Sequence, residues 1–305
     1  SPGAAEDVFF PYWETERRSE ARAVLAKMIE TRSGSEDAYI QAARFYVQKN
    51  QPEEVERILA EGIERNADSF GLRFVFSEHF IARNEPDRAL KMLEDCLALE
   101  EDSDDPNIIE TQARLARFHL QQRNNEQAEH YADEVIRKSP QNVSAHFTKG
   151  SILLMRRDGE RARAEFRTVV SEQPDFIAGY LRLAEAHVIS NELELAEDTL
   201  QNAQKIEPDS REVAIALSRV YALKKDLDAS ERELRKLLEK NPDDLQVRAG
   251  LGDLPLARER YDAAEAQYRA IREKAPENPT GYLKLARLYG RSDRIDDAVG
   301  VLRQG

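Results

Sequence analysis

The residue types that commonly support catalysis or metal binding are few in this sequence and widely spaced. The 305 residues include five histidines and a single cysteine, Cys96. No two histidines are three or four residues apart, the spacing that puts two imidazoles on one helix face for a metal ion. One cysteine can form neither an internal disulfide nor a multi-cysteine metal site. We therefore expect no catalytic centre, no metal site and no cofactor.

A phosphate-binding loop is the next chemistry to test, because two glycines lie close together in the stretch AGLGDLPLARERY, residues 249–261. Such loops follow a strand and open a helix, but no strand pattern precedes these glycines and a third glycine is missing. Two alternatives remain for this stretch, a break between two domains and a weakened helix. The repeat described below continues through the stretch, so we predict a helix that is kinked or shortened between Gly250 and Leu256 by Pro255.

The net charge of −13 is concentrated in one part of the chain. Residues 51–108 contain 16 acidic and 6 basic residues, and residues 94–105 contain seven acidic residues and no basic one. This pattern is typical of a solvated helix end and loop; alternatively, the segment binds a basic partner. Clustered Lys and Arg are lacking, so we expect no nucleic-acid partner. No apolar run approaches the roughly 20 residues of a membrane-spanning helix, so we expect no membrane insertion within the chain.

The elements that must position these residues are predicted by an internal repeat. Leu183 aligns with Leu217, and Pro208 with Pro242, each pair 34 residues apart. Repeats begin at residues 36, 70, 109, 143, 177, 211, 245 and 279, with one step longer by five residues. Position 8 is always small and position 20 nearly so, which predicts two amphipathic helices per repeat in close contact. The position 8 residues are Ala43, Ser77, Ala116, Gly150, Ala184, Ser218, Gly252 and Ala286.

This pattern resembles the tetratricopeptide repeat family, which has Leu and a small residue at positions 7 and 8, Ala at 20 and Pro at 32. The repeat beginning at 177 matches best, with Leu183, Ala184, Ala196 and Pro208. The resemblance implies an all-α fold, a right-handed superhelical solenoid of antiparallel helix pairs over residues 36–305. Residues 1–35 are expected to form a degenerate helical unit, with Ala21, Leu25 and Met28 on its second helix and aromatic residues 9, 10, 12 and 13 in place of its first.

The resemblance also implies a concave groove lined by the first helices, at positions 2, 5, 9, 12 and 13. The partner-binding residues predicted there are Ile40, Arg44, Phe74, Glu78, Arg117, Phe147, Glu185 and Arg219. The smaller apolar residues at position 5 are expected to pack between first helices, and Phe74 and Phe147 to protrude. Charge alternates in sign at position 9, with Ser151 as one neutral step. We expect a ladder of ion pairs that keeps the groove nearly neutral, suited to a partner segment of mixed charge or an apolar helix.

These features predict a non-catalytic scaffold that binds a peptide or helix of another protein. The alternative is a helper region of a larger export or assembly machine, such as a bacterial polysaccharide export system, or of a multidomain enzyme. A helical RNA binder is disfavoured by the charge, and a chaperone-tail adaptor by the missing Lys at position 5 and Asn at position 9. The absent initial Met and the last repeat, truncated at Gly305, predict a segment of a longer bacterial protein, compatible with cytoplasm or periplasm.

Overall fold

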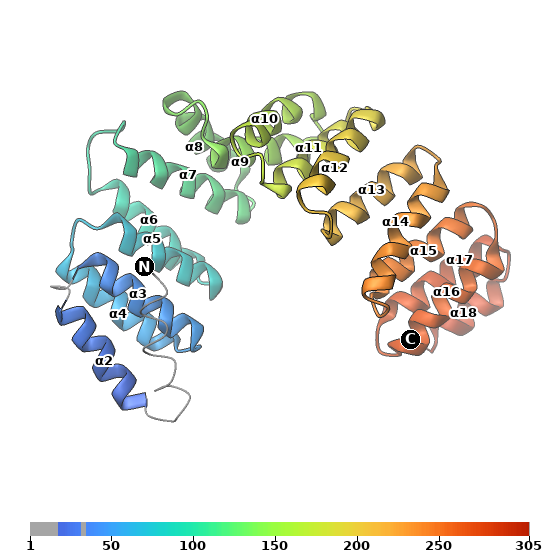
Figure 1. The fold of residues 1–305 in the computed structure, drawn as a ribbon, viewed down its shortest axis with the longest axis horizontal. Helices are drawn as coiled ribbons and strands as arrows, with labels where there is room; N and C mark the ends of the chain where they lie inside the picture. Colours follow the sequence, from blue (N-terminus) through green and yellow to red (C-terminus); the bar gives the residue numbers. More distant parts are fainter. Residues whose placement is uncertain (1–17, 32–34, 305) are drawn as a thin grey trace. The chain divides into compact units, whose positions relative to one another are not determined.

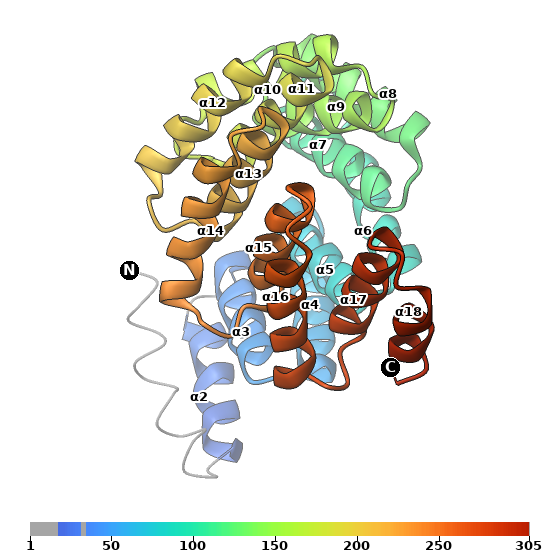
Figure 2. The ribbon, with the colours of Figure 1, turned by 90° about the vertical axis from the view of Figure 1, so that its right-hand side faces the viewer.

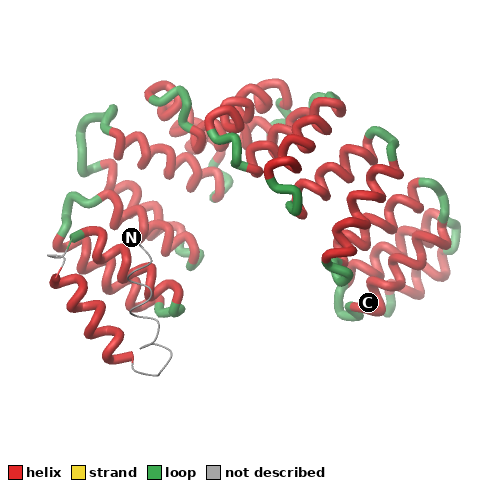
Figure 3. The backbone as a smooth tube through the Cα atoms, viewed as in Figure 1, coloured by secondary structure: helices red, strands yellow, loops and turns green. Residues whose placement is uncertain are grey.

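The computed structural model describes residues 18–31 and 35–304, and all regular secondary structure in this part is α-helical (Figure 3). The chain divides into two compact units, Ser1–Pro140 and Gln141–Gly305. In each unit, consecutive helices pack against one another as antiparallel pairs (Figure 1). The expected all-α fold of helix pairs is therefore confirmed.

The first unit contains seven described helices. They are α2 (Arg18–Thr31), α3 (Glu36–Gln48), α4 (Pro52–Arg65), α5 (Phe70–Ala82), α6 (Pro86–Leu97), α7 (Pro106–Gln121) and α8 (Asn125–Lys138). Leu25 and Ile29 of α2 are buried against α3 and its neighbours, and Met28 is partly buried there. The Ala21 side chain and the aromatic residues at 9, 10, 12 and 13 lie outside the described residues.

The second unit contains ten helices in its described residues. They are α9 (Val143–Met155), α10 (Gly159–Glu172), α11 (Ile177–Ile189), α12 (Leu193–Ile206), α13 (Arg211–Leu223), α14 (Leu227–Lys240), α15 (Leu245–Ala257), α16 (Tyr261–Lys274), α17 (Pro279–Arg291) and α18 (Ile295–Leu302). The odd-numbered members are first helices of a repeat and the even-numbered members are second helices. Figure 2 shows α15, α16 and α17 side by side, in agreement with their mutual packing.

The turn inside each repeat has one conformation that recurs along the chain. One residue of each turn has a positive φ, between 52° and 66°. These residues are Asn50, Asn84, Arg123, Arg157, Asn191, Lys225, Glu259 and Asp293. All but one step between them is 34 residues, so the same left-handed residue closes each pair of helices. Prolines follow the second helices: α12 ends at Ile206, two residues before Pro208, because proline cannot continue a helix.

The small residues at positions 8 and 20 form the contact between the two helices of a repeat. Ala196 is fully buried. Where position 8 is Ser77, its hydroxyl donates to the Ala89 carbonyl of the paired helix at 3.0 Å. Where both positions are serine, the Oγ atoms of Ser218 and Ser230 lie 2.9 Å apart. A side chain larger than these would separate the helices, so the small residues set how closely each pair packs.

Helix α15 overturns one part of the prediction made for residues 249–261, that the helix is shortened, whereas the kink stays a prediction. It spans Leu245–Ala257 with Pro255 inside, and it has the same 13 residues as α13, so it is not shortened. The proline occupies the last turn, where it removes only the N–H that would bond the Leu251 carbonyl. Buried Leu254 and Leu256 hold the helix on either side. Packing within the repeat therefore maintains the helix to its usual end.

Candidate partner-binding groove

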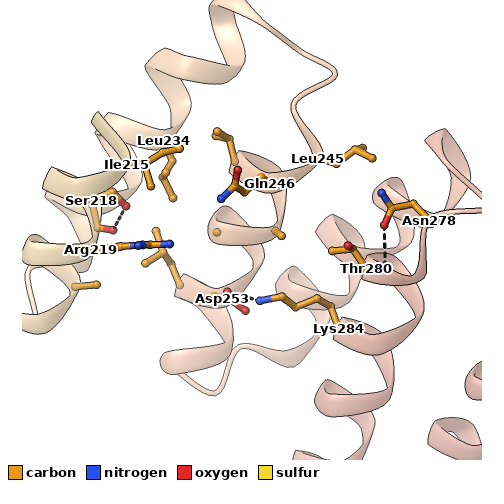
Figure 4. A pocket seen from close by; sticks show the side chains of 16 residues that line it. Ile215, Ser218, Arg219, Leu234, Leu245, Gln246, Asp253, Asn278, Thr280 and Lys284 are labelled. Atoms are coloured by element: carbon orange, nitrogen blue, oxygen red, sulfur yellow. Dashed lines mark hydrogen bonds and ion pairs between the residues drawn. The ribbon is translucent and has the colours of Figure 1, made fainter. Parts of the chain in front are cut away.

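The first helices of the second unit form a face with two adjoining cavities, of about 620 and 510 Å³. Along this face α11 packs against α13, and α15 packs against α17. The larger cavity is lined by α13, α14, α15 and α17 (Figure 4), and the smaller chiefly by α11 and α13. Ile215, Arg219 and Gln246 line both cavities. We name the combined surface from α11 to α17 the first-helix groove.

The larger cavity lies over two small residues of α15. Ala249 and Gly250 occupy positions 5 and 6, whereas α17 has Leu283 and Lys284 at the same positions. A Cβ atom on Gly250 would lie 3.1 Å from the end of the Leu234 side chain, which faces the cavity from α14. The floor is apolar, and it is formed by Ile215, Ala222, Leu234, Ala249 and Leu254. The groove can thus accept a bulky apolar side chain of a partner.

Asp253 is the acidic group of the larger cavity, and each of its carboxylate oxygens has a partner. The Tyr268 hydroxyl donates to Oδ1 at 2.7 Å, and Lys284 Nζ lies 2.5 Å from Oδ2 (Figure 4 shows the lysine contact). Burial, together with the hydrogen bond to this carboxylate, raises the pKa of Tyr268 well above its usual range, so the hydroxyl remains a donor. Asp253 is therefore part of the wall, and Lys284 balances its charge.

Arg219 is the basic group that borders both cavities. Its side chain is exposed, and Figure 4 shows it extending from α13 across the larger cavity. Within residues 18–31 and 35–304 it takes part in no ion pair. Its guanidinium carries fixed planar donors that suit a carboxylate. Arg219 is thus one charged side chain of this groove that forms no ion pair among the described residues, and the exposed Glu212 beside the smaller cavity is another.

The predicted ladder of ion pairs is wrong in its pairing. Glu78 pairs with Arg114 at 2.6 Å, and Asp253 pairs with Lys284. In both cases a position 9 carboxylate pairs with the basic residue at position 6 of the next first helix. The expected partner was at position 9 of that helix, about one turn later on the same face. Glu185 pairs with Arg182 of its own helix at 2.7 Å. The position 9 arginines, which are Arg44, Arg117, Arg219 and Arg287, are exposed and form no ion pair within the described part of the chain.

The two phenylalanines expected to protrude are instead partly buried. The Phe74 ring is covered by the Arg114 guanidinium, 4.3 Å from the ring centre, and packs against the first unit's core. The Phe147 ring contacts Phe166 and Phe176, with centroids 5.7 and 5.5 Å away. The reason is that a large apolar ring at position 5 gains more by covering its neighbours than by facing solvent.

The structure brings two of the predicted binding residues to the first-helix groove. Glu185 and Arg219 line it. Phe147 lies on α9 of the second unit and lines neither cavity. Five others belong to the first unit, namely Ile40, Arg44, Phe74, Glu78 and Arg117. Sequence reasoning missed Gly250, Gln246 and Lys284, which the cavities also use. The signal available for the missed cavity was the small pair at positions 5 and 6 of one repeat.

Residues with reactive or metal-binding side chains are dispersed in the described part of the chain. No three His, Cys, Asp or Glu residues there are arranged to hold a metal ion. Burial raises the pKa of the Cys96 thiol to about 11, which keeps it protonated. Burial lowers the pKa of His79 and of His119. None of the described helices combines the length and the apolar composition that a membrane crossing requires.

The acidic segment 94–105 ends in the loop between α6 and α7. Residues 100–104 are exposed, and Asp105 caps α7 by accepting from the Asn107 N–H at 2.7 Å. Lys138 of α8 donates to the Ser103 carbonyl and lies 3.9 Å from the Asp104 carboxylate. One lysine of the same unit therefore already faces this segment, and a basic partner remains a prediction.

Repeated antiparallel helix pairs with a groove along the first helices define a class of protein, the α-solenoids. The chain belongs to the tetratricopeptide repeat family. Two family models, both described as Tetratricopeptide repeat, match it. One matches residues 114–175, and the other matches 12–71, 153–217 and 190–254, which is more than half of the chain. No curated protein matches the sequence.

Solved structures share the fold at low identity. A tetratricopeptide repeat protein from Parabacteroides merdae has a TM-score of 0.64 and 14% identity, covering 77% of this chain and 91% of its own. The type IV pilus biogenesis factor PilW has a TM-score of 0.59 and 15% identity, covering 68% of this chain and 93% of its own. The APC/C hetero-tetramer Cut9-Hcn1 has a TM-score of 0.62 and 13% identity, covering 88% of this chain and 52% of its own. The fold is that of protein-interaction scaffolds, a class that is typically non-catalytic.

Proposed function

We propose that this chain is a non-catalytic scaffold that binds a peptide or helix of a partner protein in the first-helix groove. The observation that carries the proposal is the cavity of about 620 Å³ over Ala249 and Gly250. It combines an apolar floor with Arg219, a charged side chain that the described residues leave without an ion pair. Binding sites for side chains of partners have this composition, because apolar burial supplies affinity and a few polar groups fix orientation.

Filling the cavity without unfolding the protein tests this proposal. Gly250→Leu would place a side chain over Leu234 and into the cavity. The substitution would also remove a glycine from the helix interior, and this removal favours the helix by about 1 kcal/mol. We expect this variant to be at least as stable as the native chain and to lose binding of peptides selected on the native chain from a displayed random library. Fluorescence anisotropy measures the binding, and thermal unfolding the stability.

Gly300→Leu is the matched control, because Gly300 lies on the second helix α18 and a Cβ there meets no atom within 4 Å. It makes the same chemical change away from the groove and should leave binding intact. Equal binding by the native and Gly250→Leu chains would refute the groove as the site. Failure of the library to yield any binder would refute peptide binding altogether.

The alternative, a helper role in an export or assembly machine or in a larger enzyme, involves the same groove. It differs in what flanks the groove in the full-length protein, and the gene sequence around this segment tests it. A signal peptide or a barrel would favour export, and a catalytic domain would favour the enzyme.

A further inference from the structure

The charges of the second unit are sorted between its two kinds of helix. Its first helices, α9, α11, α13, α15 and α17, contain eight basic residues and three acidic ones. The basic residues are Lys149, Arg182, Arg211, Arg219, Arg248, Lys284, Arg287 and Arg291. The acidic residues are Glu185, Glu212 and Asp253. The first helices of this unit therefore carry an excess of five basic residues, within a chain whose net charge is −13.

The second helices of the same unit do not share this excess. In α10, α14 and α16 the acidic and basic residues are equal in number, and α12 and α18 are each acidic by two charges. Because the repeat alternates first and second helices along the chain, a count over the whole sequence averages the two faces. Counting the two kinds of helix separately reveals the basic excess of the first helices.

Ion pairing reduces this excess without removing it. Lys149 and Arg211 pair with Glu165 and Asp244, which lie outside the first helices. Glu185 pairs with Arg182, and Asp253 is held by Lys284 and Tyr268. Arg219 and Arg287, both exposed, remain without an ion pair among the described residues. They occupy the same repeat position on α13 and α17 and so face the same side of the unit.

Resting on the function proposed above, we propose that the partner segment of the first-helix groove is an acidic peptide. Its carboxylates bind Arg219 and Arg287, and an apolar side chain next to them fills the cavity over Ala249 and Gly250. Charge complementarity carries this assignment, since paired carboxylate and guanidinium groups fix register and speed encounter. It replaces the sequence-based expectation of a partner of mixed charge or an apolar helix.

A peptide suits this groove better than a nucleic acid does. The cavity floor consists of aliphatic side chains, and Ile215, Leu234 and Leu254 offer no aromatic platform for a base. The acidic faces α12 and α18 and the overall charge of −13 repel a long polyanion. A short peptide can place a few carboxylates on the arginines without approaching those faces.

The test selects peptides from a displayed random library on the intact chain and reads their sequences. We expect enriched peptides to contain Asp or Glu beside a bulky apolar residue, and their Kd to rise with ionic strength. Replacing their Asp and Glu by Asn and Gln should weaken binding about tenfold or more. Enriched peptides without acidic bias would overturn this inference and leave the proposed function standing, whereas the absence of any enriched peptide would overturn both.

Charge reversal locates the effect. The double variant Arg219→Glu with Arg287→Glu should abolish the selection of acidic peptides. The matched control is Arg167→Glu with Arg232→Glu, because these exposed arginines lie on second helices and also form no ion pair among the described residues. Equal losses in the two double variants would overturn the assignment, and thermal unfolding checks that both are folded.

Two other occupants are tested with the same chain and variants. Oligouridine that binds more tightly than the selected peptides would show a nucleic-acid groove and overturn the inference. Self-association lost in the Arg219→Glu and Arg287→Glu variant, measured by sedimentation, would show that a second copy occupies the groove. A chain that is monomeric and that binds oligouridine more weakly than the selected peptides supports the acidic peptide as the occupant.

Discussion

Gly252 of α15 lies directly against the ring of Tyr268 of α16. A Cβ atom on Gly252 would be 2.8 Å from Cδ1 of that ring and closer still to Cε1. The ring is fully buried, and its hydroxyl is held by Asp253, so it cannot move aside. The two glycines of residues 249–261 therefore have opposite roles, because Gly252 sets the spacing of a helix pair and Gly250 opens a cavity.

This contrast predicts opposite effects of the same substitution. Gly252→Ala should destabilise the chain by up to about 2 kcal/mol, since overpacking costs about 1–3 kcal/mol and better helix propensity offsets about 1. Gly250→Ala should stabilise it by about 0.5–1 kcal/mol, because its Cβ meets only a flexible leucine end. Urea unfolding followed by far-UV circular dichroism measures both. Shifts of the same sign would contradict the assigned roles.

The left-handed turn residues predict a gain in stability. Arg157 has φ 58°, a conformation that costs a residue with a Cβ about 1 kcal/mol more than glycine. Arg157→Gly should therefore raise the unfolding midpoint, by an amount corresponding to at most about 1 kcal/mol. Asn191→Gly is the comparison, because asparagine already tolerates φ 59° and should gain less. If both variants gain equally, backbone strain is not the cause.

Pro255 predicts a second route to stabilisation. Pro255→Tyr restores an N–H to the last turn of α15 and places tyrosine at a position where Tyr289 of α17 is buried and donates to Glu265 at 2.9 Å. We expect a gain of about 1–3 kcal/mol in differential scanning calorimetry. Pro255→Ala separates the backbone effect from the ring. A loss of stability in both variants would show that the proline is preferred here.

The buried histidines of the first unit predict destabilisation by acid. Burial lowers the pKa of His119 and of His79, so the unfolded chain binds protons that the folded chain does not. The stability that the neutral histidines contribute to the folded chain is complete above the unfolded pKa of about 6.5, and it is lost as the pH falls below that value.

The urea concentration at the unfolding midpoint should therefore decrease as the pH is lowered from about 7.5 to about 5.5. His119→Tyr should make this decrease smaller. Tyrosine suits the site, since the corresponding residue of α3, Tyr46, is buried. Adding His79→Phe should reduce the fall further. An unchanged pH dependence in the double variant would assign the acid sensitivity to other groups.

The repeat could be read from the sequence because it depends on local patterns. Small residues at positions 8 and 20, such as Ala184 and Ala196, and prolines such as Pro208 recur every 34 residues, and helix periodicity converts that spacing into two packed helices. The α15 helix shows the limit of the local view, since a proline and two glycines predicted a kinked or shortened helix and packing preserved its length.

The candidate site was less accessible from the sequence. Position 9 indicated Glu185 and Arg219 as groove residues, and both line the groove. Their partners depend on how one helix is offset against the next. Asp253 therefore meets Lys284 rather than the arginine expected at position 9.

The sequence by itself determined the all-α repeat, its helix pairs and the small residues between them, because each follows from the chemistry of neighbouring positions. Tertiary structure decided which charges pair and where the cavity opens. Those properties arise between helices 34 residues apart, whose stagger and shared face no local pattern specifies.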